Sequence, residues 1–167
     1  MIKIRKRDPD EMIPLTYDTV FTGFFNDEDN MEILESLVEI FLDNEYGPVK
    51  GNLHIKKREM DSRAFSEKKG QMDVILSMNG VKINLEMNRY PSKRTLKRNA
   101  IYASGIYGRG MKKSDSSYED LPTVVQIDFN LGYHNQKYFI KDYYLMSPEE
   151  GDILTKDLRI IYVDLEK

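Results

Sequence analysis

The stretch QMDVILSMNGVKINLEMN, residues 71–88, carries the clearest information about the fold. An Asn79-Gly80 pair separates two runs in which apolar and polar residues alternate, and this pattern is the strongest short-range signal for a β-hairpin. A two-residue turn at this pair fixes the pairing of the strands. Met78 then faces Val81, and Asp73 faces Glu86.

The same alternation divides the hairpin into two faces. One face is entirely apolar and is predicted to lie in the core; it holds Met72, Val74, Leu76, Met78, Val81, Ile83, Leu85 and Met87. The other face is mostly polar and holds Gln71, Asp73, Ile75, Ser77, Lys82, Asn84, Glu86 and Asn88.

The polar face places two acids opposite each other. Facing residues have Cβ atoms roughly 4.5–5.5 Å apart, and like charges at that distance are destabilising. Asp73 and Glu86 therefore require a cation, a shared proton or full solvation. A hard divalent ion such as Mg²⁺ binds through one or two carboxylates and keeps several waters, which it can turn into nucleophiles. The alternative interpretation is a hairpin whose polar side simply faces water.

Three helices are expected outside the hairpin. The segment PLTYDTVFTGFFND, residues 14–27, has helical spacing of apolar residues and Thr16 as a candidate cap. A second helix begins after Asp29 or Asn30 and ends before Gly47-Pro48. A third runs from about 93 to 107. One side of it is lined by Leu96, Ala100, Ala103 and Tyr107.

Four further strands complete the predicted sheet. They cover residues 52–60, as an edge strand, and 122–130, 136–145 and 158–165. The order of elements predicts one domain over residues 1–167, with a mixed β-sheet flanked by helices. Its class is α/β, on the border with α+β.

Composition narrows the class of protein. Hydrophobic residues make up 40% and charged residues 32% of the 167 residues, which argues against disorder. The chain has no cysteine, so disulfides and thiolate zinc sites are excluded. There is no apolar run of about 18 residues and no secretory leader, so a cytoplasmic location is the default expectation.

Charge is distributed unevenly along the chain. The net charge is −3, yet residues 89–113 contain eight basic residues and no acidic one. This asymmetry predicts an anionic partner near the third helix, although a solvated helix surface would look the same. Arg94, Lys97 and Arg98 lie close together on that helix and are the predicted contacts to nucleic-acid phosphates.

Several stretches together resemble a known family. The run GQMDVILSMNGVKINLEMN is similar to the core of the PD-(D/E)XK nuclease family transposases, or recombination-promoting nucleases, whose pattern is an aspartate, a hairpin and Glu-x-Gln. The resemblance extends from about residue 14 to 167. It includes LTYDTVFTGFF, KRNAIYASGIY, YEDLPTVVQIDF, YFIKDYYL and LTKDLRIIYVDLEK.

The resemblance implies a restriction-endonuclease-like fold and a metal-dependent DNA endonuclease linked to mobile-element recombination. Mg²⁺ or Mn²⁺ would be held by Asp73, Glu86 and the backbone carbonyl of Met87. Asp18 would be the acidic residue near the metal. Asn88 would take the place of the superfamily's lysine, which orients the attacking water.

Two residues depart from the family's pattern. Asn88 stands where glutamine is usual; an amide can hold a water but supplies no positive charge. Thr22 stands where the family often has lysine. Lys82, Lys97 or Arg98 could supply the missing positive charge, and the sequence does not choose among them. A catalytically inactive module that binds nucleic acid or a protein is therefore the alternative function.

Two expectations concern assembly and length. Cutting both DNA strands would favour a homodimer. The chain stops at Lys167, next to a predicted strand where relatives usually continue, so a further C-terminal region is expected.

Overall fold

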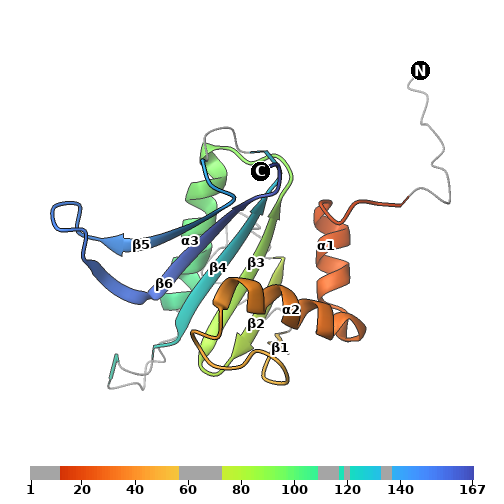
Figure 1. The fold of residues 1–167 in the computed structure, drawn as a ribbon, viewed down its shortest axis with the longest axis horizontal. Helices are drawn as coiled ribbons and strands as arrows, with labels where there is room; N and C mark the ends of the chain where they lie inside the picture. The colour runs from red at the N-terminus through yellow and green to blue at the C-terminus, as the bar shows by residue number, and fades with distance from the viewer. Residues whose placement is uncertain (1–11, 57–72, 109–116, 119–120, 133–136) are drawn as a thin grey trace.

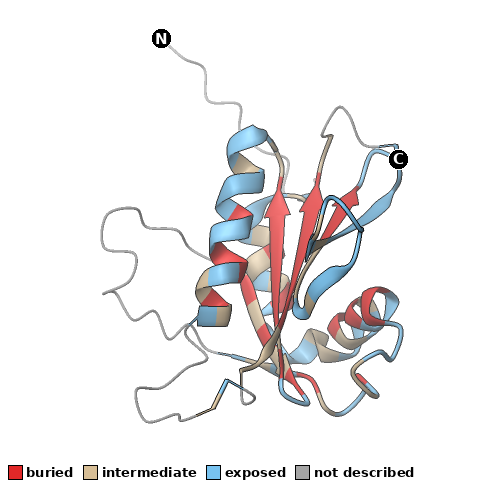
Figure 2. Cartoon of the chain, turned by 90° about the vertical axis from the view of Figure 1, so that its left-hand side faces the viewer, coloured by how far each residue is buried: buried red, intermediate tan, exposed pale blue. Residues whose placement is uncertain are grey.

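The computed structural model describes residues 12–56, 73–108, 117–118, 121–132 and 137–167. Within these ranges a six-stranded mixed sheet has the strand order β1-β2-β3-β4-β6-β5 (Figure 1). Helices α1 and α2 lie on one side of the sheet, and α3 lies on the other (Figures 1 and 2). The predicted fold class, a mixed sheet flanked by helices, is confirmed.

The elements follow the chain in a simple order. The helices are α1 (Asp18–Phe25), the 3₁₀ helix η1 (Glu28–Asn30), α2 (Met31–Leu42) and α3 (Lys93–Gly108). The strands are β1 (His54–Ile55), β2 (Val74–Met78), β3 (Val81–Asn88), β4 (Thr123–Asn130), β5 (Ile140–Met146) and β6 (Ile153–Asp164).

The β2–β3 hairpin has the predicted register. Val74 pairs with Leu85 and Met78 with Val81, across a turn at Asn79 and Gly80. Both turn residues have positive φ, 47° and 82°, as a type I′ turn requires, and glycine and asparagine tolerate this backbone region best. The turn therefore fixes which residues of β2 and β3 share a face.

The centre of the sheet is parallel. Strand β3 connects through α3 to β4, which runs parallel to it, and β4 is in turn parallel to β6. The carboxyl ends of β3, β4 and β6 therefore meet at one edge of the sheet, where binding sites of open α/β sheets usually form. β5 pairs antiparallel with β6 and forms the outer edge.

The two faces of the hairpin are both covered. The apolar face packs against α1 and α2 in the main core, so the core prediction is confirmed for its members between Val74 and Met87. Met72 and Gln71 lie outside the described residues. The polar face lies under α3, and Asn84, Glu86 and Asn88 on it are buried. The alternative of a water-facing polar side is therefore wrong for these three residues.

Several local predictions need correction. Tyr17, not Thr16, is the residue before α1, and it makes no side-chain capping bond. The Asn30 side chain also caps nothing at α2; it donates instead to the Phe24 carbonyl. The buried side of α3 is formed by Asn99, Tyr102, Ala103 and Ile106, while Leu96 and Ala100 are exposed.

The shift of the α3 stripe has a physical cause. The helix packs partly on polar side chains of β3 and β4, so its buried face begins with the amide of Asn99 and becomes apolar only near its end. There Ala103 and Ile106 contact Val124 in a second, smaller core. Among the described residues no helix is both long enough and apolar enough to cross a membrane.

Candidate metal centre

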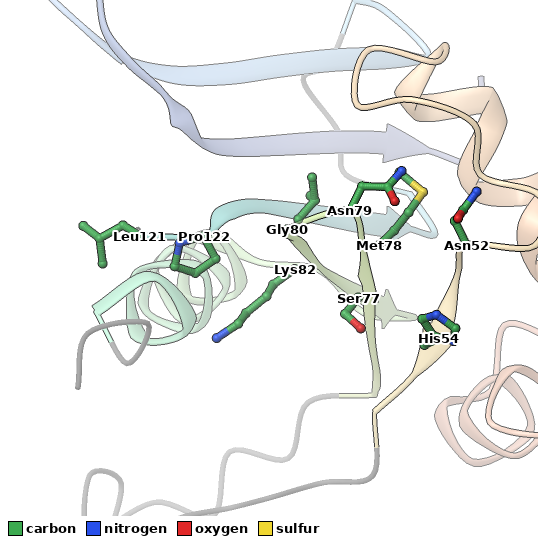
Figure 3. Close-up of a pocket in the computed structure, with 10 residues that line it drawn as sticks. Asn52, His54, Ser77, Met78, Asn79, Gly80, Lys82, Leu121 and Pro122 are labelled. Atoms are coloured by element: carbon green, nitrogen blue, oxygen red, sulfur yellow. The ribbon is translucent and has the colours of Figure 1, made fainter. Parts of the chain in front are cut away.

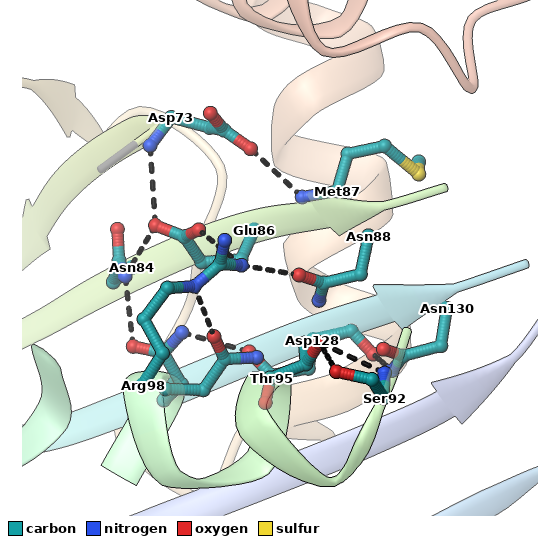
Figure 4. A network of polar contacts seen from close by, with 12 residues as sticks. Asp73, Asn84, Glu86, Met87, Asn88, Ser92, Thr95, Arg98, Asp128 and Asn130 are labelled. Carbon is teal, nitrogen blue, oxygen red and sulfur yellow. Dashed lines mark hydrogen bonds and ion pairs between the residues drawn. The ribbon is translucent and has the colours of Figure 1, made fainter. Parts of the chain in front are cut away.

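Asp73 and Glu86 lie side by side where β2 begins and β3 approaches its end (Figure 4). The backbone N–H of Asp73 donates to Glu86 Oε1 at 3.2 Å, and the backbone N–H of Met87 donates to Asp73 Oδ2 at 2.9 Å. The hairpin register therefore continues past Val74 and brings the two acids together. Glu86 is 2% exposed, whereas Asp73 is half-buried.

The electrostatics of Glu86 reflect this arrangement. Burial, and then the negative charge of Asp73, raise the pKa of Glu86 from 4.5 to about 8. Hydrogen bonding from Asn84 and the charge of Arg98 act in the opposite direction. At neutral pH the site therefore either keeps a proton on Glu86 or requires a positive charge close to it.

A row of polar side chains continues from Glu86 beneath α3. Asn84 Nδ2 donates to Glu86 Oε1 at 3.2 Å and to Gln126 Oε1 at 2.7 Å. Gln126 Nε2 donates to Asp128 Oδ1 at 2.7 Å. Each of these four side chains is buried, so the row acts as a fixed support behind the two acids.

Asp128 is a residue that sequence reasoning missed. It pairs with Glu86 across the parallel β3–β4 ladder and is 1% exposed. Burial raises its pKa to about 6, and the amides of Gln126 and Asn99 hold the pKa down. A signal was present: the polar residues of QIDFN, residues 126–130, alternate in the same way as those of NLEMN, residues 84–88.

Asn88 faces the same site from the end of β3. Its Oδ1 accepts a hydrogen bond from Arg98 of α3 (Figure 4). A second Arg98 contact, from Nη2 to Glu86 Oε2, measures 3.6 Å. Within the described part of the chain, the buried Asn88 Nδ2 donates to no partner. A buried donor is costly to leave without a partner, so a water or ligand oxygen that reaches it would be bound.

Comparison with known proteins agrees with this geometry. A family model described as PD-(D/E)XK nuclease family transposase matches residues 15–167. The chain belongs to this family. Neither the curated proteins nor the solved structures contain a match to the chain.

The acid predicted on α1, Asp18, is the first residue of that helix, and its place near the metal stays a prediction. Tyr17, next to Asp18, stacks on Arg89 just after β3, with the guanidinium 3.5 Å from the ring centroid. The opposite end of α1 contacts the pair, because Asn26 Nδ2 donates to the Asp73 carbonyl at 3.1 Å. At 1.5 Å per residue, Asp18 lies about 12 Å along the helix from Asn26. The role of Asn26 in positioning Asp73 was not predicted.

Three basic residues were candidates to supply the positive charge that Asn88 lacks at the position of the superfamily's lysine, and their positions in the structure differ. Of the three considered, Arg98 reaches Glu86 and Asn88. Lys97 is exposed on α3, as is Arg94. Lys82 pairs with Ser77 near the hairpin turn, four residues from Glu86 and so about 13 Å along the strand.

Lys82 belongs to a different part of the surface. With His54, Ser77 and Asn79 it lines a pocket of about 500 Å³ at the turn end of the hairpin (Figure 3).

Thr22, the other departure from the family's pattern, is half-buried on α1.

The residues present fit the divalent ion that PD-(D/E)XK nucleases generally use. Over the described ranges, no three acidic or histidine side chains cluster closely enough to form a closed metal cage. Two carboxylates are nevertheless sufficient for Mg²⁺, which commonly completes its shell with water and phosphate oxygens. The Met87 side chain packs into the core, so only its backbone is available as the predicted third ligand.

Proposed function

We propose that this protein is a divalent-metal-dependent DNA endonuclease linked to mobile-element recombination, with Asp73 and Glu86 as its metal ligands. The observation that carries the proposal is the contact of these two acids on adjacent strands, together with the raised pKa of Glu86. An ionised buried carboxylate beside a second acid is destabilising, and a bound cation lowers that cost.

Each side chain has a definite task in this mechanism. When bound, Mg²⁺ or Mn²⁺ supplies the Lewis acidity that makes a water nucleophilic and offsets charge on the departing oxygen. Asn88 Nδ2, a buried donor that has no partner among the described residues, orients the attacking water. The row of Asn84, Gln126 and Asp128 fixes Glu86 from behind and excludes water on that side.

DNA is the substrate class that the family description and the charge distribution support. The basic window of residues 89–113 includes the exposed Arg94 and Lys97 on α3, the same helix that brings Arg98 to Glu86. Contacts of this kind hold the phosphate backbone without reading base sequence. The enzyme is therefore expected to bind DNA in a salt-dependent manner.

Asp73→Asn is expected to reduce nicking of supercoiled plasmid by at least about a hundredfold, because the neutral amide is a poor ligand for a hard cation. The assay compares Mg²⁺, Mn²⁺ and excess chelator, and gel electrophoresis measures the nicked fraction over time. Asp152→Asn is the matched control, since Asp152 is an exposed residue in the β5–β6 turn.

The outcome separates two functions. Metal-dependent nicking that is lost in Asp73→Asn and kept in Asp152→Asn supports the endonuclease. Nicking that survives in Asp73→Asn contradicts the assigned ligands. Tight, salt-dependent DNA binding by the unsubstituted protein with no cleavage under any metal indicates the inactive binding module instead.

A further inference from the structure

Arg98 occupies an unusual place for a residue of a basic helix. Its side chain is 46% exposed, yet its guanidinium turns inward, contacting Asn88 Oδ1 and approaching Glu86 Oε2 to 3.6 Å (Figure 4). Arg94, one turn earlier, is exposed, and its guanidinium makes no hydrogen bond to another described residue. Arg98 therefore differs from the neighbouring basic residues in what it contacts.

The orientation of Arg98 is fixed from behind. Its Nε donates to Asn99 Oδ1 at 3.2 Å, and Asn99 is 1% exposed. Asn99 in turn lies beside Asp128, and its amide lowers the pKa of that carboxyl. Among the described residues, neither Asn99 Nδ2 nor Asp128 Oδ2 has a well-aligned hydrogen-bond partner. One nitrogen is thus held by Asn99 and another by Asn88.

The remaining donors of Arg98 are available. A guanidinium has five N–H groups in a fixed planar fork that matches two phosphate oxygens. Within the described residues, the hydrogen bonds of Arg98 engage Nε and Nη2 and leave Nη1. Because the side chain is partly exposed, this nitrogen can meet a ligand that approaches the acids from solvent.

We infer that Arg98 is a catalytic residue. From α3 it supplies the positive charge that the superfamily's lysine would carry and that Asn88, in the place of that lysine, cannot supply. In this assignment Arg98 contacts the phosphate oxygens at the scissile bond, and Asn88 holds its guanidinium in place as well as orienting water. This inference rests on the proposed function and assigns one of its catalytic groups. It replaces a general backbone contact with a specific role at the reacting phosphate.

The assignment predicts opposite effects on metal binding and on catalysis. A fixed guanidinium close to Glu86 repels a cation at the same carboxylate. Removing the charge should therefore strengthen metal binding, while it removes stabilisation of the phosphate during cleavage. A residue with only a structural role would weaken both properties when replaced.

Arg98→Met is expected to lower kcat for nicking by about 100- to 1000-fold, the usual effect of losing one such donor, with KM changed only a few-fold. The same variant, free of DNA, is expected to bind Mn²⁺ several-fold more tightly by isothermal titration calorimetry. Lys156→Met is the matched control: it removes one positive charge from an exposed position on β6, so it should leave kcat and Mn²⁺ affinity unchanged. Arg94→Met, which removes a charge from the same helix as Arg98, should weaken DNA binding.

A rescue experiment tests the position of the charge. Arg98→Lys keeps a positive charge and is expected to retain at least about a tenth of the activity. The double variant Asn88→Lys/Arg98→Met moves the charge to position 88, the place of the superfamily's lysine. Its nicking activity should be at least about tenfold higher than that of Arg98→Met. Thermal melting of every variant verifies folding. If the double variant does not fold, the activity of Arg98→Lys and the calorimetry of Arg98→Met still test the role of Arg98.

The results distinguish this inference from the proposed function. If the unsubstituted protein neither binds Mn²⁺ nor nicks DNA, the proposed function fails. If it does both, but Arg98→Met keeps its kcat or binds Mn²⁺ more weakly while folded, the role of Arg98 is overturned and the endonuclease stands. Loss of activity equal to that in Arg94→Met would return Arg98 to a general phosphate contact.

Discussion

Glu86→Gln should lose nicking activity by at least about a thousandfold and, in the same protein, increase the free energy of unfolding without metal. The first effect follows because an amide cannot replace an ionised ligand of Mg²⁺ or Mn²⁺. The second follows from the raised pKa of Glu86, about 8 in the folded chain. Glutamine keeps an oxygen for Asn84 and the Asp73 N–H but carries no buried charge.

The sign of the stability effect depends on pH. The folded protein holds the Glu86 proton more tightly than the unfolded chain does, so this group stabilises the fold at low pH and loses that contribution as the pH rises through about 8. The free energy of unfolding of Glu86→Gln should therefore equal that of the unsubstituted protein near pH 5. At pH 8 the variant should be more stable by about 2 kcal/mol. This value is smaller than the full pKa shift of Glu86 would give, because the folded site can relax around the ionised carboxylate.

Urea unfolding at both pH values, with chelator present, measures this difference. Glu39→Gln is the control, since Glu39 is an exposed glutamate on α2. Equal stability of the Glu86→Gln and unsubstituted proteins at pH 8 would mean that Glu86 is not destabilised by burial. Higher stability combined with full nicking activity would remove Glu86 from the metal ligands.

The rate of nicking at limiting metal is expected to rise by up to about tenfold per pH unit between pH 6 and 7.5 and to level off above about pH 8. Glu86 must lose its proton before it can bind a cation, and its pKa lies at about 8 in the metal-free protein. Because the metal competes with the proton, a high concentration of Mn²⁺ should shift the plateau to lower pH.

Proton release gives an independent measurement of the same event. Calorimetric titration of Mn²⁺ at pH 7 in two buffers of different ionisation enthalpy should show close to one proton released per ion. In Glu86→Gln that release should disappear. A nicking rate that does not change between pH 6 and 8 at limiting metal would contradict a protonated Glu86 as the group that controls metal binding.

The hairpin and its register could be predicted from sequence because the controlling signals are local. The Asn79-Gly80 turn and strict alternation determine the pairing of β2 with β3, and so bring Asp73 beside Glu86. The wrong alternative, a polar face open to water, shows the limit of this reasoning. Alternation says that two faces differ, but it does not say what covers each of them.

The rest of the site depends on contacts between distant segments. Asp128 joins the site because β4 pairs in parallel with β3, a pairing set by the crossover through α3. Arg98 was one of three candidates, and only the packing of α3 on the sheet shows that it meets Asn88 and Glu86. The expected apolar stripe of α3 was wrong for Leu96 and Ala100 for the same reason: the first part of the helix packs on polar side chains.

The central claim is that Asp73 and Glu86 together hold one divalent ion. Crystals grown with Mn²⁺, with diffraction recorded at the manganese absorption edge, test it most directly. We expect one strong anomalous peak within coordination distance of a carboxylate oxygen from each residue, and no peak there in Asp73→Asn crystals. No peak at this position at saturating Mn²⁺, or a peak bound by other residues, would contradict the assignment.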